Sequence, residues 1–272
     1  MTRVRRIPVG VDSQVPTGKT NAYVIITSNE EYQGDTGSRP EAILVDPPAQ
    51  APEIDMVVDK LTVSHILVTH THPDHVGGVS VYADTTDATV WCRHGRVQRF
   101  YETTGVNPDQ TFREGTILPV DESVQILDLP GHAPDHIGIE TKIGILCGDI
   151  ARANGSVAIT SPDGAMRAYF VALRRLHARQ PACLYPGHGE VISNPRETCM
   201  RLLMHRQERE KNILTAITGN ATSVETILEQ AYDKNITSVR DLARATVVAH
   251  LEKLDADGRI AFNRETKMVR EI

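Results

Sequence analysis

The chain has 272 residues, of which 40% are hydrophobic and 24% charged, and its formal net charge is −6 at pH 7. This length and apolar content suffice for a substantial core, so we expect one large domain and one small domain. The acidic balance argues against a protein that depends on many phosphate contacts. No run approaches the roughly 18 apolar residues of a membrane-spanning helix.

The cysteines and the first residues bear on location. Four cysteines without CxxC spacing favour free thiols in a reducing compartment over disulfides or a metal cluster. The first ten residues carry three arginines but lack the apolar region of a secretion signal. We therefore expect a soluble cytoplasmic protein without a membrane partner, while a short organellar targeting peptide stays an open alternative.

Short apolar runs alternate with helical patterns along the first 195 residues, which predicts an α/β domain. Apolar positions recur at helical spacing from Ile54 to Leu61 and from Met166 to Leu176. Before, between and after these helices we expect strands, at residues 22–26, 42–46, 65–69, 89–92, 124–129, 137–141, 144–146 and 182–185.

The residues after the third expected strand are the most informative in the chain. His70, His72, Asp74 and His75 lie within six residues. Side chains leaving a strand end point in different directions, so two neighbouring cations could each take ligands from this stretch. Imidazole and carboxylate ligands suit zinc, iron or manganese. The alternative is a polar loop that happens to be rich in histidine.

Further ligands follow three other strand-like runs, which disfavours that alternative. His132, Asp149 and His188 each come directly after a glycine that ends such a run. A glycine at this position lets the backbone pass close to an ion. All the expected ligands therefore come from strand ends.

The pattern changes after His188. Residues 196–218 form a helical pattern whose middle, residues 205–211, is polar all round, as in a helix that bridges two domains. We place a boundary near Asn194, which gives domains of residues 1–195 and 196–272. Thr222 and Ser238 each begin an [ST]xx[DE] helix start, and residues 258–262 and 267–270 are typical of a hairpin. Three helices and a hairpin predict a winged-helix-like domain.

The order HxHxDH, His, Asp, His resembles the metallo-β-lactamase superfamily of hydrolases. Together with His205-Arg206 on the long helix and the terminal module, it is similar to the lactamase-beta-2-like branch. The resemblance implies an αβ/βα sandwich with a C-terminal winged-helix-like domain. Asp46 is expected to orient a ligand. The implied ligands are His70, His72 and His132 for one metal, and Asp74, His75 and His188 for the other, with Asp149 bridging.

The resemblance also implies the chemistry. Two ions, zinc or else iron or manganese, would share a water and hold it as hydroxide. Asp74 would accept a hydrogen bond from this hydroxide and is the expected catalytic residue. True β-lactamases of this fold usually have cysteine in place of Asp149 and lack a histidine at the position of His75. Antibiotic hydrolysis is therefore not expected.

Three functions compete. The first is an endoribonuclease on single-stranded RNA, as in members of the branch, and the second is a thioester hydrolase of the hydroxyacylglutathione type. The third is a non-catalytic winged-helix binder of nucleic acid. Residues 196–272 carry a net charge of +1 and residues 1–195 a net −7, so no strong basic surface supports RNA binding. We favour a packing role for the terminal domain, against the catalytic domain or a homo-oligomer mate; the role of His136 stays open.

Overall fold

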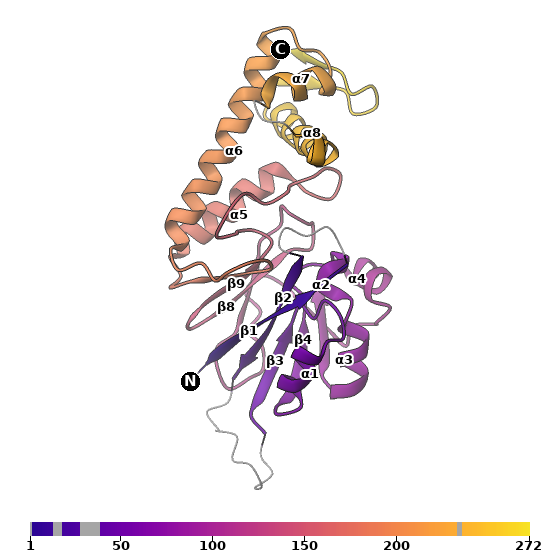
Figure 1. The fold of residues 1–272 in the computed structure, drawn as a ribbon, viewed down its shortest axis with the longest axis vertical. Coiled ribbons are helices and arrows are strands. Elements are labelled where there is room, and N and C mark those ends of the chain that lie inside the picture. The colour runs from indigo at the N-terminus through magenta and orange to yellow at the C-terminus, as the bar shows by residue number, and fades with distance from the viewer. Residues whose placement is uncertain (1, 13–17, 28–38, 233–235) are drawn as a thin grey trace. The chain divides into compact units, whose positions relative to one another are not determined.

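The computed structural model describes residues 2–12, 18–27, 39–232 and 236–272 (Figure 1). The chain forms two compact units. The first comprises Met1–Asp128, Asp135–Gly155 and Gln180–Pro195, and the second comprises Leu129–Pro134, Ser156–Arg179 and Arg196–Ile272. The second unit thus takes in two segments from before the long helix. The division into domains of residues 1–195 and 196–272 stays a prediction.

Two sheets form the centre of the first unit. The six-stranded sheet has the order β1-β2-β3-β4-β5-β6, antiparallel from β1 to β3 and parallel from β3 to β6. The four-stranded sheet has the order β10-β9-β8-β7. The strands are β1 Arg3–Gly10, β2 Lys19–Ile26, β3 Glu41–Val45, β4 Thr62–Leu67, β5 Thr89–Arg93, β6 Gln110–Phe112, β7 Gln125–Asp128, β8 Ile137–Thr141, β9 Gly144–Gly148 and β10 Leu184–Pro186.

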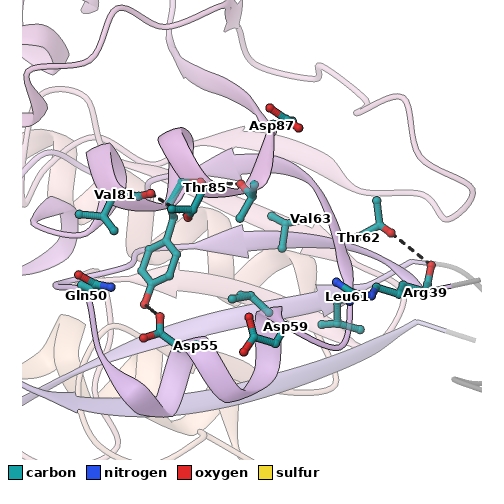
Figure 2. A pocket seen from close by; sticks show the side chains of 13 residues that line it. Arg39, Gln50, Asp55, Asp59, Leu61, Thr62, Val63, Val81, Thr85 and Asp87 are labelled. Carbon is teal, nitrogen blue, oxygen red and sulfur yellow. Dashed lines mark hydrogen bonds between the residues drawn. The ribbon is translucent and has the colours of Figure 1, made fainter. Parts of the chain in front are cut away.

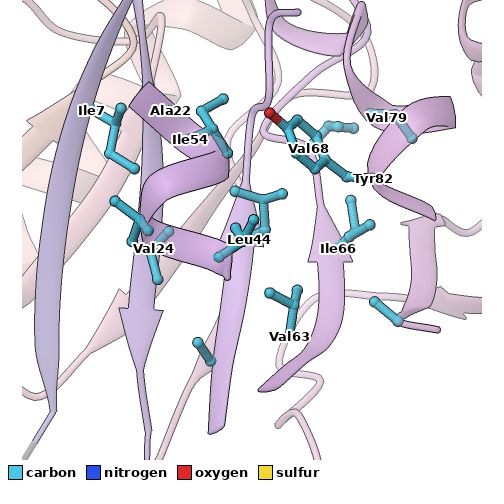
Figure 3. Close-up of a cluster of buried hydrophobic side chains, with 14 of the residues drawn as sticks. Ile7, Ala22, Val24, Leu44, Ile54, Val63, Ile66, Val68, Val79 and Tyr82 are labelled. Atoms are coloured by element: carbon cyan, nitrogen blue, oxygen red, sulfur yellow. The ribbon is translucent and has the colours of Figure 1, made fainter. Parts of the chain in front are cut away.

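Both faces of the central strands are buried, and alternate residues serve different cores. On one face, Val24, Leu44 and Ile66 pack with Ile54 of helix α1 (Pro52–Val58) and Tyr82 of helix α3 (Val79–Thr86) (Figure 3). On the other face the six-stranded sheet packs against the four-stranded one through the cluster that contains Tyr23, Ile25, Ile43, Val45, Leu67, Ile126, Ile137, Ile139 and Leu146. The helices of this unit are α1 Pro52–Val58, α2 Pro73–Val76, α3 Val79–Thr86 and α4 Val97–Thr104.

The second unit is helical and ends in a two-stranded hairpin. Its elements are α5 Met166–Arg179, α6 Pro195–Thr218, α7 Val224–Ala231, the 3₁₀ turn Thr237–Val239, α8 Arg240–Ala256, β11 Ile260–Phe262 and β12 Val269–Glu271. One apolar cluster joins α6, α7, α8 and the hairpin, with Ile213, Ile227 and Leu251 fully buried. The two packed sheets and the helical unit with its hairpin agree with the predicted αβ/βα sandwich and winged-helix-like domain.

Two predicted helix starts are wrong in detail. The cap of α7 is Ser223 and not Thr222, because Ser223 and Thr226 bond each other's backbone amides reciprocally. The α8 helix begins at Arg240 after Val239, which makes no side-chain cap, so Ser238 does not cap it.

The middle of α6 is polar in sequence, but one of its side chains, Arg206, is buried. None of the helices in the described part of the chain has the length and hydrophobicity of a membrane span.

Candidate metal centre

Six of the seven predicted ligands belong to the first unit, where they follow the ends of three strands. His70 and His72 lie in the loop after β4, and the single turn of α2 carries Asp74 and His75. Asp149 directly follows β9, and His188 comes two residues after β10. Because β9 and β10 are parallel neighbours, the residues after their carboxyl ends meet at one edge of the sheet.

The nitrogen and oxygen atoms of these residues converge. His188 Nε2 lies 3.3 Å from an oxygen of Asp74 and 3.3 Å from one of Asp149. His75 Nε2 lies 3.5 Å from Asp74 Oδ2 and 3.7 Å from Asp149 Oδ1. His70 joins the same cluster, since its ligand atom and those of His75 and Asp149 all lie within 4.8 Å of one another.

The fit of these residues to a metal ion rests on His75. Its side chain is fully buried, and its Nε2 has no hydrogen-bond partner among the described residues. A buried ring nitrogen that faces two carboxylates without a hydrogen bond is costly unless a cation lies between them. Ligand atoms 3 to 4 Å apart also suit an ion held at about 2.0–2.2 Å from each. The residues therefore fit a metal.

In three of these histidines Nδ1 is anchored, which directs Nε2 into the cluster. Nδ1 of His188 lies 2.9 Å from the carbonyl oxygen of Lys19, and Nδ1 of His70 lies 3.1 Å from the hydroxyl of Thr69. Nδ1 of His75 lies 3.0 Å from Asp46 Oδ2. Such bonds fix the tautomer and the orientation of metal-binding imidazoles. His72 differs, because its Nδ1 lies 3.1 Å from His70 Nε2.

Asp46, which sequence reasoning expected to orient a ligand, contacts two parts of the ligand loop. Its carboxylate accepts hydrogen bonds from the amide of Thr69 at 2.6 Å and from the Thr69 hydroxyl at 2.6 Å, besides facing His75. The residue is buried, and its backbone φ is 49°. Left-handed backbone at a non-glycine residue costs energy and persists where surrounding contacts enforce it.

Strand β2 holds the His188 loop, and this support was missed from the sequence. The Asn21 side-chain amide donates to the carbonyls of Pro186 and Gly189, both at 2.9 Å, and the Tyr23 hydroxyl donates to Pro186 at 2.7 Å. In the same strand, the Thr20 hydroxyl donates to Asp74 at 3.2 Å. Each contact joins residues more than 50 positions apart, so no local pattern could reveal it.

The pair Asp135 and His136 supports two ligand loops from the start of β8. Asp135 accepts hydrogen bonds from the amide and the hydroxyl of Thr71, at 3.1 and 2.7 Å. His136 Nε2 accepts the amide N–H of Asp149 at 3.0 Å, and its ring stacks on His70 at 4.9 Å between centroids. His136, whose role the sequence left open, is therefore a support of the cluster in this arrangement.

The cluster is also electrostatically polarised. Burial alone would lower the pKa of His188, but hydrogen bonding to Asp149 and Asp74 raises it to about 10. Burial likewise opposes a rise in the pKa of His75, which Asp46 nevertheless produces. Burial would raise the pKa of Asp74, yet His188 and His75 lower it. The carboxylates thus favour positive charge at the position where a metal would supply it.

His132 belongs to the second unit, so its place in the ligand set stays a prediction. Its Nδ1 lies 2.8 Å from the carbonyl oxygen of Ala158, in the same unit. This contact anchors one ring nitrogen and leaves Nε2 as the ligand atom, as for His188 and His75.

A hollow elsewhere in the first unit is separate from this cluster. It has a volume of about 510 Å³ and is lined by parts of α1, α3 and the start of β4 (Figure 2). Tyr82 donates a hydrogen bond to Asp55 at 2.8 Å in its wall. The predicted ligands follow the other end of β4, and the described residues that line the hollow include none of them.

Comparisons with known proteins agree with the fold. The family profile described as metallo-beta-lactamase superfamily matches residues 15–188, and that of the beta-lactamase associated winged helix domain matches residues 223–267. The chain is 25% identical over 262 residues to the beta-lactamase-like protein 2 homolog of Drosophila melanogaster, which covers 90% of this chain and 85% of that protein. It is 25% identical over 260 residues to an atrochrysone carboxyl ACP thioesterase of Emericella nidulans, covering 89% of this chain and 76% of that protein.

Solved structures give the same fold. A metallo-beta-lactamase family protein from Thermus thermophilus superposes with a TM-score of 0.76 at 20% identity, covering 99% of this chain and 98% of that one. At that identity the likeness shows the fold alone. TTHA1623, crystallised in a di-iron-bound form, gives a TM-score of 0.52 at 27% identity and covers 70% of this chain and 96% of that one.

Proposed function

Since the chain belongs to the metallo-beta-lactamase superfamily and is a hydrolase of that superfamily, we propose that it hydrolyses a thioester at a dinuclear metal centre. The observation that carries the proposal is the convergence of buried His75 Nε2 and His188 Nε2 on the carboxylates of Asp74 and Asp149. A site of this composition needs no covalent nucleophile.

Each ligand has a proposed place. His70, His72 and His132 would hold one ion, Asp74, His75 and His188 the other, and Asp149 both. When bound, two ions polarise the thioester carbonyl and make water nucleophilic at neutral pH. Asp74, held by the Thr20 hydroxyl, would accept a hydrogen bond from the attacking water and so orient it. Asp46 and His136 would keep the ligand loops in place.

Three observations favour a thioester over RNA. Curated relatives that match most of the chain carry the name atrochrysone carboxyl ACP thioesterase. The last 77 residues have a net charge of only +1, whereas proteins that bind nucleic acid need a basic surface. Helix α8 is buried at six successive residues, Thr246 to Leu251, as expected where a helix packs inside its own domain and not against RNA. RNA cleavage is therefore the alternative that the assay must test.

The identity of the metal is a separate part of the proposal. Zinc is our first expectation, and imidazole with carboxylate also suits iron and manganese. The di-iron form of TTHA1623 supports including iron. A cytoplasmic location and a homo-oligomer likewise stay predictions, and the oligomer is tested by the mass of the purified protein in solution.

The deciding experiment combines elemental analysis of the purified protein with parallel assays on an acyl-glutathione, an acyl-pantetheine thioester and single-stranded RNA. We expect thioester cleavage that a chelator abolishes. Asp149→Ala should lower both the metal content and the rate, by about 100-fold or more, because it removes a ligand that both ions share. His65→Ala is the control, since His65 Nδ1 accepts the Trp91 indole N–H outside the cluster. RNA cleavage without thioester cleavage, or full activity after chelation, would refute the proposal.

A further inference from the structure

Arg206 is a buried cation in the long helix α6. Only 4% of its surface is exposed, although it lies in a run of polar residues. Its guanidinium donates a hydrogen bond to the carbonyl oxygen of Val157 and lies 5.9 Å from the centre of the Tyr169 ring. Burying a guanidinium is costly unless its hydrogen bonds are well placed. This position therefore demands an explanation beyond the solubility of the helix.

The segment that Arg206 holds has no regular secondary structure. Residues 156–160 lie in neither helix nor strand, yet Val157 and Ile159 are buried. The backbone polar groups of such a segment need partners from elsewhere in the fold. Arg206 supplies one at Val157, and directly after the segment the amide of Ser161 donates to the carbonyl of Ala245 on α8 at 3.4 Å. Both contacts come from helices after residue 195.

The next carbonyl along this segment belongs to Ala158 and accepts the ring N–H of His132 at 2.8 Å. On the other side, Gly131 has a φ of 147°, and a Cβ there would lie 2.5 Å from the backbone of Tyr169. His132 is thus fixed through Ala158 and through Gly131. Arg206 contacts the neighbour of each: Val157, which precedes Ala158, and Tyr169, against which Gly131 packs.

We infer that Arg206 is a positioning residue for the ligand His132, acting through the Val157-Ala158 backbone. Because the Val157 carbonyl is held, the adjoining Ala158 carbonyl has a fixed direction and fixes the tautomer and orientation of the imidazole. The inference rests on the proposed function, in which His132 binds a metal. It gives the long helix a role in metal binding that needs no contact with the substrate.

Arg209 offers a matched control one turn along the same helix. Its guanidinium donates to the carbonyl of Ala231 at the end of α7 and lies 3.5 Å from the centre of the Tyr232 ring. It is therefore also an arginine that joins α6 to a carbonyl and an aromatic ring, but it contacts α7 and not the segment before α5. A general loss of helix packing should affect both variants.

The test measures metal affinity by competition with a chromogenic chelator, using zinc and the full chain. Arg206→Met should weaken one of two zinc equivalents by about 10- to 100-fold, the range typical of residues that orient ligands. Arg206→Lys, which keeps one donor, should lie between that variant and the wild type. Arg209→Met should lower the thermal midpoint while leaving zinc affinity within about 3-fold, the margin that separates it from the orienting effect.

A double variant separates positioning from general damage. If Arg206 acts through His132, Arg206→Met should weaken zinc binding no further in a His132→Ala background. Wild-type affinity in Arg206→Met, or a further loss in the double variant, would overturn the inference while leaving the proposed function intact. Wild-type affinity in His132→Ala would instead refute the ligand assignment, and the inference with it. Should Arg206→Met fail to fold, Arg206→Lys decides alone, and wild-type affinity there overturns the inference.

Discussion

The carboxylate of Asp46 ties the end of strand β3 to the ligand loop after β4. It accepts hydrogen bonds from the backbone and the hydroxyl of Thr69 and faces Nδ1 of His75 at 3.0 Å. A carboxylate accepts at both oxygens, whereas an amide offers one acceptor and one donor group. The orientation of His75 therefore depends on the acid itself and not only on the shape of the residue.

Asp46→Asn should weaken metal binding by about 10- to 100-fold, because the ring of His75 would lose its carboxylate partner. The measurement is the metal retained per chain after dialysis against a weak chelator. Asp59→Asn serves as the control, because Asp59 is exposed at the end of α1. Equal retention in Asp46→Asn and the wild type would contradict the role of Asp46.

Sequence reasoning named the proposed ligands but missed most of the residues that contact them. His70 to His75 form a compact pattern, and His132, Asp149 and His188 each follow a glycine at the end of an apolar run. Asn21 lies 165 positions from Pro186 in the chain. Its contact arises only when β2 packs beside the His188 loop, and an asparagine in a strand pattern carries no local sign of it.

At the scale of elements, strands and helices with a regular apolar pattern were predictable, whereas an edge strand and a short helix were not. The strand expected at residues 137–141 is β8 with the same limits. Strand β1 was not predicted, since it carries three arginines and Pro8, features that suit an edge strand with one exposed side. Helix α3 was missed because it is short and rich in valine and threonine, which are weak helix formers.

Helix caps show the same limit, since the first residue of neither [ST]xx[DE] pattern caps its helix: Ser223 caps α7, and Val239 precedes α8 without a side-chain cap. Ser223→Ala should destabilise the protein by about 1 kcal/mol, because it removes the hydrogen bond that the Ser223 side chain accepts from Thr226 at the start of α7. Ser238→Ala should change stability by less than about 0.5 kcal/mol, because Ser238 is exposed and does not cap α8. Denaturant unfolding curves of the two variants measure this difference. Equal losses would show that the caps are assigned incorrectly.

At the scale of the whole molecule, the second unit combines segments that lie far apart in the sequence. Leu129–Pro134, Ser156–Arg179 and Arg196–Ile272 form one compact unit. Helix α5 shows this clearly: Arg167 pairs with Asp257 at 2.5 Å, and the ammonium of Lys253 lies 5.3 Å from the centre of the Phe170 ring. Apolar periodicity predicts α5 but not its partner, because partners depend on how the chain returns.

Deleting residues 196–272 should therefore also destabilise the part of the second unit that remains. The remaining chain would keep α5 and the loop of His132 but lose their partners in α6 and α8, so we expect lower solubility, a lower thermal midpoint and the loss of about one metal equivalent. Cleavage of a thioester and of a small phosphodiester should fall alike, since the deletion disturbs the centre itself. The readouts are metal content, light scattering and both assays on the same preparation. A soluble truncation with both metals bound that loses only RNA cleavage would show that the terminal domain presents RNA, which is the opposite of the packing role argued from the burial of α8.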